Sequence, residues 1–390
     1  MQGIKQLYKI GYGPSSSHTI APYRAAILYK NNNLKCDYYE IELSGSLALT
    51  AHGHGTIEIL KKALETDNIK FNLNFDNNEN LIIIKGFSNN SEINTWHCKS
   101  IGGGSITIDE YECDDLLEVY KENNFDEIKE YLKTNKCSLL DYVYLNEPDL
   151  KQYLLEALNT MFFVVNNGIN NEGLLNEELN YYRIAKKMYK KCETRDDYLV
   201  AYAYAACEEN ASGALMCTAP TLGACGILTS LMYYLHFNEN VELDKLCDLL
   251  AIAGVFGNVI KENASIAGST GGCQAEVGTA CAMASAAITY FNGYDLNTIE
   301  YAAEMGIEHF LGLTCDPVKG YVIIPCIERN AISILKAFDC AYLAQQLKDI
   351  KHNLVSFDKV VKAMNYTGSK IVNELKETSL GGLSLEFKNE

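Results

Sequence analysis

The pattern of apolar and polar positions divides the sequence into two parts. In the first 110 residues, short segments at 38–43, 70–75 and 81–87 alternate apolar with polar side chains, and clusters of Asn, Asp and Gly separate them. Alternation between turn residues predicts β-strands. Residues Thr56–Glu65 instead repeat apolar side chains at helical spacing. This first part is therefore predicted to be α+β.

From about residue 150 the pattern predicts long helices and almost no strands. Apolar residues recur every three or four positions, the spacing of a buried helix face, in Asp149–Asn166, Leu179–Lys191, Tyr198–Glu208, Leu243–Lys261, Leu296–His309, Ala331–Lys348 and Asp358–Glu377. We predict an α+β domain over residues 1–145, followed by a larger all-α domain over residues 146–390. Glycine-rich breaks at 213–226, 268–278 and 312–320 interrupt the helices, and irregular segments held by helices often carry function.

Two segments, Ala211–Leu235 and Val277–Tyr294, contain no charged residue. Their length would suit a membrane span. The first, however, is interrupted by proline and glycines and is rich in Ser, Thr and Cys, which makes it less apolar than a typical span. Buried helices and loops of a soluble core are the better interpretation.

Composition narrows the classes of ligand. The net charge of −17 argues against binding to nucleic acids or anionic membranes, so we expect a small-molecule ligand. The 14 cysteines would suit a disulfide scaffold only in a short secreted chain, and the N-terminus does not resemble a signal peptide. A reducing, cytoplasmic location is expected.

The stretch GPSSSHT at 13–19 places three hydroxyls and a histidine after a Gly-Pro turn signal. Hydroxyls and free backbone N–H groups in a turn form a cradle for a phosphate or a carboxylate. A helix N-terminus with capping hydroxyls explains the same residues. The stretch alone does not decide between the two.

Three cysteines differ from the others, most of which lie in apolar, Ala-rich segments. Cys273, Cys315 and Cys326 occur in GSTGGCQAEVG, GLTCDPVKG and IPCIERN, beside glycine or proline. Such loops leave backbone N–H groups free to hydrogen-bond sulfur. The spacing fits neither a zinc finger nor a ferredoxin, and buried thiols are the more common explanation of three scattered cysteines. Three ligands without a fourth would leave one iron of a [4Fe–4S] cluster open as a Lewis acid.

The chain closely resembles the iron–sulfur-dependent L-serine dehydratases (L-serine ammonia-lyases), nearly from end to end. The motifs that carry the resemblance occur in the family's order: GPSSSHT, SGSLALTAHGHGT, SIGGG, ENASG, TAPTLGACG, NASIAGSTGGCQAEVGTACAMA, IEHFLGLTCDPVKGYVIIPCIERNA and ETSLGGL. It looks like the compact single-chain form, with a β-type domain followed by an α-type catalytic domain.

The resemblance implies a site between the two domains. Cys273, Cys315 and Cys326 would hold a [4Fe–4S] cluster, and the segment Ser15, Ser16, Ser17, His18 and Thr19 would face it and bind an amino-acid substrate. The reaction implied is the dehydration of L-serine to pyruvate and ammonia, a step of amino-acid degradation. A homodimer is also implied.

The reaction needs a base for the Cα proton. His54 is favoured, because imidazole titrates near neutral pH and because the family's motif has a histidine here. His52 and His18 stay open as alternatives, and His18 is also a candidate for orienting the substrate.

Further binding candidates are Asn210, Ser212, Thr218, Thr221 and Asn263. Glu328 and Arg329 directly follow Cys326 and are either further binding candidates or, equally, a buried ion pair that supports the cysteine loop. His309 is expected to support the site indirectly or to be structural. No lysine has the surroundings of a pyridoxal phosphate site.

Three positions depart from the family's usual residues: Ile57, Leu215 and Leu222. Because of these departures, L-threonine or L-cysteine stays open as the substrate. A second alternative is a protein without catalytic activity that senses amino acids or iron–sulfur clusters. An α-helical protein with inert cysteines is the remaining alternative. Since no cysteine follows Cys340, we also expect an iron site that no group from the C-terminal tail, cysteine or carboxylate, enters.

Overall fold

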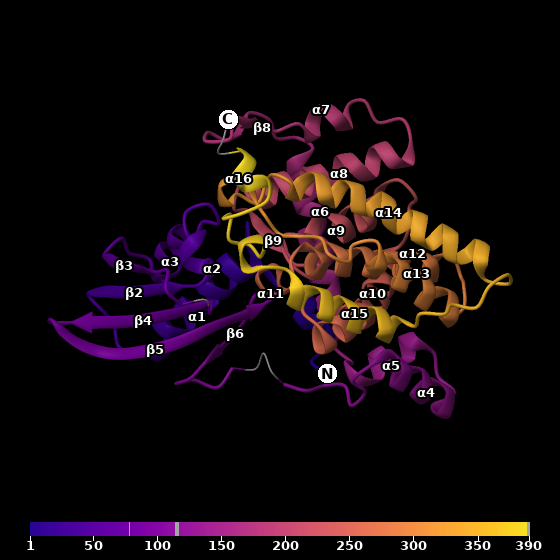
Figure 1. Cartoon of the computed structure of the whole chain (residues 1–390), viewed down its shortest axis with the longest axis horizontal. Coiled ribbons are helices and arrows are strands. Elements are labelled where there is room, and N and C mark those ends of the chain that lie inside the picture. The colour runs from indigo at the N-terminus through magenta and orange to yellow at the C-terminus, as the bar shows by residue number, and fades with distance from the viewer. Residues whose placement is uncertain (78, 114–116, 388–390) are drawn as a thin grey trace.

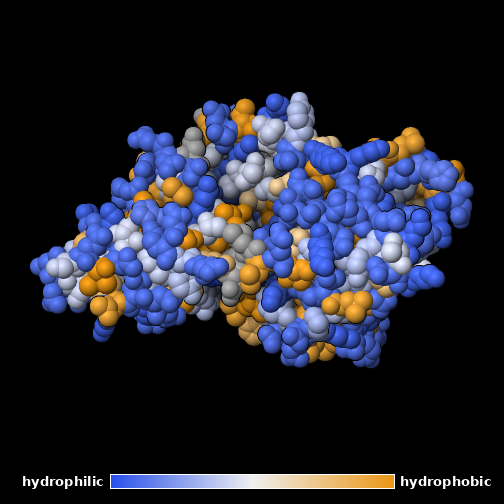
Figure 2. All heavy atoms as spheres, turned by 90° about the horizontal axis from the view of Figure 1, so that it is seen from below, coloured by the Kyte–Doolittle hydropathy of each residue, from blue (hydrophilic) through white to orange (hydrophobic). Residues whose placement is uncertain are grey.

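The computed structural model describes residues 1–77, 79–113 and 117–387. A sheet with three helices forms one end of the molecule, and a larger helical part forms the rest (Figure 1). This confirms the predicted α+β segment followed by a helical one. The face in Figure 2 is hydrophilic over most of its area.

The five-stranded sheet has the order β3-β2-β4-β5-β6. Strands β2 and β3 are parallel, and the other neighbours are antiparallel. Alternate side chains of β2 and β4 are buried under helices α1 and α3, and together they form a separate hydrophobic core. The elements of this part are α1 (Ala21–Asn32), β2 (Tyr38–Ser44), α2 (Ser46–Leu49), α3 (Thr56–Leu64), β3 (Ile69–Asn74), β4 (Leu81–Ser88), β5 (Ser91–Gly102) and β6 (Ser105–Ile108).

The helical part packs around α9 and α12, whose side chains are buried along almost their whole length. These are the two uncharged segments of the sequence, and no helix in the described residues is long and apolar enough to cross a membrane. The helices are α4 (Phe125–Asn135), α5 (Leu139–Asn146), α6 (Leu150–Gly168), α7 (Ala185–Tyr189), α8 (Arg195–Ala211), α9 (Cys225–Phe237), α10 (Leu243–Asn263), α11 (Gly268–Gly271), α12 (Thr279–Phe291), α13 (Leu296–Glu308), α14 (Cys326–Leu347), α15 (Phe357–Lys370) and α16 (Leu383–Phe387).

Packing groups the chain differently from the expected boundary at residue 145. The first residues, including η1 (Ile4–Leu7), lie in the larger core together with α4 and α5. Strand β1 (Ile10–Tyr12) pairs antiparallel with β9 (Leu215–Cys217). The N-terminal segment is thereby held to the helical part before the chain enters the sheet.

Three helix predictions show the largest differences at their ends. Only Ala185–Tyr189 of the segment 179–191 is helical, and β8 (Tyr181–Tyr182) precedes it, paired with β7 (Leu174–Asn176). Helix α14 starts at Cys326 instead of residue 331. Helix α15 ends at Lys370 instead of residue 377, because Ile371 turns to an extended conformation.

Candidate active site

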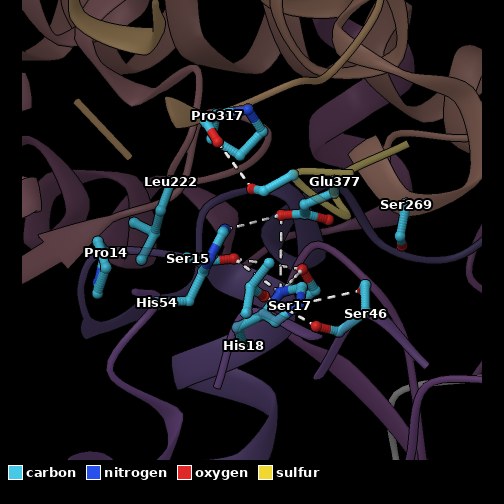
Figure 3. A network of polar contacts seen from close by, with 12 residues as sticks. Pro14, Ser15, Ser17, His18, Ser46, His54, Leu222, Ser269, Pro317 and Glu377 are labelled. Carbon is cyan, nitrogen blue, oxygen red and sulfur yellow. Dashed lines mark hydrogen bonds and ion pairs between the residues drawn. The ribbon is translucent and has the colours of Figure 1, made fainter. Parts of the chain in front are cut away.

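A small cavity lies where the N-terminal segment, the sheet part and the helical part meet. Its walls come from distant parts of the sequence: Pro14, Ser15, His54, Gly223, Glu276, Cys315, Pro317, Val322, Cys326 and Glu377. The polar side chains on its N-terminal side are seen in Figure 3. The structure thus brings together two of the three cysteines with part of the hydroxyl cluster and one histidine.

His18 lies in a single π-helical turn, η2 (Ser16–Ile20), and is fully buried. Its Nδ1 lies 2.9 Å from Ser17 Oγ and 3.2 Å from Ser15 Oγ. Its Nε2 lies 3.1 Å from Ser46 Oγ. Burial lowers the pKa of His18 to about 4, against the opposing charge of Glu377, so the ring is neutral at physiological pH.

His54 and Glu377 form a buried pair next to His18. His54 Nε2 lies 3.4 Å from Glu377 Oε1, and the rings of His54 and His18 are 4.5 Å apart (Figure 3). A carboxylate only accepts hydrogen bonds, so Nε2 is the protonated nitrogen of His54. Nδ1 is buried and has no hydrogen-bond partner among the described residues. A free lone pair at a cavity wall is the arrangement a general base requires.

Glu377 is held in place by the strand-like segment that follows α15. Cys315 N–H donates to Leu375 O at 2.8 Å, and Glu377 N–H donates to Cys315 O at 2.7 Å. Burial raises the pKa of Glu377, but His18 and His54 outweigh it, and the net pKa is lowered. The expectation that no carboxylate from the C-terminal tail enters the site is therefore wrong.

Cys315 and Cys326 line the opposite side of the cavity, and Cys273 lies beside Cys315. Cys273 and Cys315 lie with Glu276 in a group whose ligand atoms are within 4.8 Å of one another. Cys326, the first residue of α14, lines the same cavity outside that group. A hydrogen bond from Cys315 lowers the pKa of Cys273, and the Arg329 guanidinium also favours its thiolate. The hydrogen bond to Cys273 and burial raise the pKa of Cys315, and burial and nearby charges raise the pKa of Cys326, so of the three a thiolate is favoured at Cys273 alone. Two thiols at the cavity and a third beside them are nevertheless a donor set that fits an iron–sulfur cluster, which binds thiolates.

Glu276 is the second buried carboxyl group at the cavity, in the π-helical turn η4 (Gln274–Gly278). Burial raises its pKa well above the usual range, and Glu377 and Cys273 add to that effect. Two glycines make room for it, because a Cβ at Gly223 or Gly268 would lie 2.8 or 2.7 Å from its carboxyl oxygens. These effects favour the protonated, neutral form of Glu276, which can donate a hydrogen bond.

Several predicted binding residues lie in the framework around the cavity. Thr19 Oγ1 donates to Tyr12 O, Thr218 Oγ1 donates to Leu7 O, and Ser212 Oγ donates to Glu209 O. Asn263 Nδ2 donates to Asn123 O and Val259 O at the end of α10.

Asn210 is closer to the cavity than these. Its Nδ2 donates to Pro14 O at 2.8 Å and to Leu222 O, while its buried Oδ1 has no partner among the described residues. It ties the turn before the serines to the helical part. Ser16 and Thr221 are buried nearby.

The remaining candidate residues differ in how far their side chains are exposed to solvent. His52 is exposed whereas His54 is buried, which favours His54 as the base. His309 is half-exposed, and its ring contacts Met305 O. The expected ion pair of Glu328 with Arg329 is absent from the described residues, because Glu328 is exposed and Arg329 pairs with Asp316 at 3.4 Å.

Sequence reasoning missed Glu377, Glu276 and Ser46 as site residues. Each lies inside a motif that carries the family resemblance, but a lone Glu or Ser in such a motif gives no signal of burial. Of the three departures, Ile57, Leu215 and Leu222, none lines the cavity.

Comparisons with known proteins identify the family of the chain. Residues 57–384 match the family "Serine dehydratase alpha chain", and residues 3–74 match "Serine dehydratase beta chain". The chain is 33% identical to an L-serine dehydratase of Streptomyces coelicolor, covering 98% of each chain. It is 34% identical to one of Helicobacter pylori, covering 99% of each, and 32% identical to L-serine dehydratase 1 of Escherichia coli, covering 100% of each. On these matches, and on a site built from both matched regions, the chain belongs to the serine dehydratase family.

Proposed function

We propose that the chain is an L-serine ammonia-lyase, and that Cys273, Cys315 and Cys326 hold a [4Fe–4S] cluster. The observation that carries the proposal is the cavity itself, with cysteines on one side and Ser15, His54 and Glu377 on the other. The relatives named above are L-serine dehydratases over their whole length. A homodimer in the cytoplasm stays a prediction.

A bound cluster would supply a Lewis acid, which stabilises the charge that develops on a departing hydroxyl. The chain's own residues supply the rest. The hydroxyl of Ser15 is placed to donate to the substrate carboxylate, since Ser15 lines the cavity. The neutral carboxyl of Glu276 is a donor on the cysteine side.

His54 takes the Cα proton on Nδ1, and Glu377 stabilises the imidazolium that forms. The Cα proton and the β-hydroxide together make one water once His54 gives up its proton, and their loss converts L-serine to aminoacrylate. Tautomerisation and addition of one water then release ammonia and give pyruvate, so the atoms balance. The exposed His52 has no part in this reaction.

The test is anaerobic reconstitution with iron and sulfide, followed by measurement of iron content, visible absorption and 2-oxo acid release from L-serine, L-threonine and L-cysteine. Cys315→Ala is expected to lose both the absorption and the activity. Cys247→Ala is the matched control, because Cys247 is buried elsewhere in the larger core. We expect it to retain both.

Three outcomes contradict the proposal in different ways. A colourless reconstituted wild type argues for inert cysteines. A cluster with no turnover on any of the three amino acids argues for a sensor. Turnover of L-threonine or L-cysteine without L-serine would change the substrate and keep the site.

A further inference from the structure

The two ring nitrogens of His18 have different neighbours, and the hydrogen bonds around them determine which nitrogen carries the proton. Nε2 faces a single hydroxyl, that of Ser46, at 3.1 Å. Nδ1 faces the hydroxyls of Ser17 and Ser15. A hydroxyl both donates and accepts, so the tautomer is set by whatever fixes the direction of these hydroxyls.

Asn80, which directly precedes β4, fixes the direction of the Ser46 hydroxyl. The backbone N–H of Ser46 donates to Asn80 Oδ1 at 2.9 Å. Because a backbone N–H is always a donor, the amide atom facing it must be the oxygen, which excludes the flipped amide. The orientation of Asn80 therefore follows from the backbone of α2.

Ser46 Oγ also lies 2.9 Å from the same oxygen of Asn80. An amide oxygen accepts only, so the one hydrogen of the Ser46 hydroxyl points to Asn80. Ser46 Oγ then has only lone pairs for His18, and His18 Nε2 must be the donor. The alternative tautomer would place two lone pairs face to face at one of these contacts.

We propose that Asn80 is a positioning residue that holds His18 in the Nε2–H tautomer through Ser46. The lone pair of Nδ1 then accepts a hydrogen bond from Ser17, the nearer hydroxyl at 2.9 Å, and the hydrogen of the Ser15 hydroxyl stays available to the cavity. Neutral His18 makes no hydrogen bond to Glu377, 3.6 Å away, which leaves the Glu377 carboxylate to His54. The expected effect on turnover rests on the proposed function. The tautomer of His18 is argued from the hydrogen bonds alone and does not depend on that function.

Asn80 also joins the two parts of the molecule, because its Nδ2 donates to Ser269 Oγ in α11 at 3.2 Å. This contact gives a control. Ser269→Ala removes the partner of Nδ2 and leaves Oδ1 and its two hydrogen bonds unchanged. If Asn80 acted only by joining the two parts, this variant would match the loss of Asn80 itself.

The test uses the full chain without a cluster, labelled with ¹⁵N-histidine, in long-range ¹H–¹⁵N correlation spectra at neutral pH, with His18→Gln to assign the signal. The wild type is expected to show a protonated Nε2 and a bare Nδ1. Asn80→Asp and Ser269→Ala should keep this pattern, because both leave an acceptor for Ser46. Asn80→Ala and Ser46→Ala should shift the pattern toward Nδ1–H. If Asn80→Ala does not fold, Ser46→Ala replaces it in the test, because that variant keeps the hydrogen bond from the backbone N–H of residue 46 to Asn80.

A protonated Nδ1 in the wild type, or an unchanged pattern in both Asn80→Ala and Ser46→Ala, would overturn the proposal. In the reconstituted enzyme we expect Asn80→Ala to lower kcat about 10-fold or more, as for other residues that orient a functional histidine, with Asn80→Asp recovering part of it. A shifted tautomer with unchanged kcat would remove the positioning role. A wild type without turnover, by contrast, would count against the proposed function only.

Discussion

At the scale of single residues, the site depends on buried polar groups whose protonation states differ. His18 is a neutral ring, Glu377 a carboxylate, and Glu276 a neutral acid. Burial penalises every charge, so a carboxylate persists only where donors outweigh that cost. Glu377 has His54 beside it, whereas Glu276 has sulfur and a second acid.

The low pKa of His18 makes the stability of the cluster-free protein depend on pH. An unfolded histidine titrates near 6.5 and His18 near 4, so between these values the unfolded chain binds more protons. His18 therefore contributes stability that is complete above pH 6.5 and is lost as the pH falls toward 4. At pH 5 the loss is on the order of 2 kcal/mol.

Urea unfolding at pH 7.5 and pH 5.0 measures this loss. We expect the wild type to lose more stability on acidification than His18→Gln. The exposed His52→Gln should behave like the wild type. Equal losses in wild type and His18→Gln would show that His18 is not buried as a neutral ring.

At the scale of elements, the functional residues lie where regular structure is interrupted. His18 and Glu276 are in single π-helical turns, which are frequent at functional sites. Glu377 lies beyond the end of α15, paired with the backbone of Cys315. An element assignment from periodicity is weakest at these positions.

The segment after α15 gives the second residue-specific test. Glu377→Gln keeps the size of the side chain and removes the charge that orients His54, so we expect kcat to fall on the order of 100-fold. Glu374→Gln, three residues earlier on an exposed turn, is the matched control and should stay within about twofold of the wild type. The measurement is the steady-state kcat of both variants at equal cluster content. Equal rates would remove Glu377 from the reaction.

The sequence predicted the elements better than the site. Strands at 38–43 and 81–87 and the long helices follow from local periodicity, which needs no knowledge of the neighbours. The extra length assigned to α15, up to Glu377, shows the limit. The hydrogen bonds that draw Glu377 to Cys315 are made by residues 60 or more positions apart, and no local pattern encodes them.

At the scale of the whole molecule, two separate hydrophobic cores meet at the site. The larger core contains the first residues of the chain as well as the helices, and the smaller core lies between the sheet and α1 and α3. Cavity residues come from both sides of this junction. The relative placement of the two parts is therefore a condition for activity.

The single tryptophan, Trp96, is buried in the smaller core and allows the cores to be followed separately. Ile4→Ala should cost about 2–5 kcal/mol and shift the unfolding midpoint of far-UV circular dichroism more than that of Trp96 fluorescence. Leu43→Ala, in the sheet core, should do the reverse. Identical shifts of both signals in both variants would contradict two separable cores.

The cavity draws on residues 14–15 and on Glu377, near opposite ends of the described chain. During synthesis, all three cysteines leave the ribosome before Glu377 is added. A polypeptide interrupted anywhere between Cys326 and Glu377 would thus carry the whole proposed ligand set without the carboxylate that completes the acid–base pair. The reactive site therefore cannot be complete until the chain has been translated past Glu377.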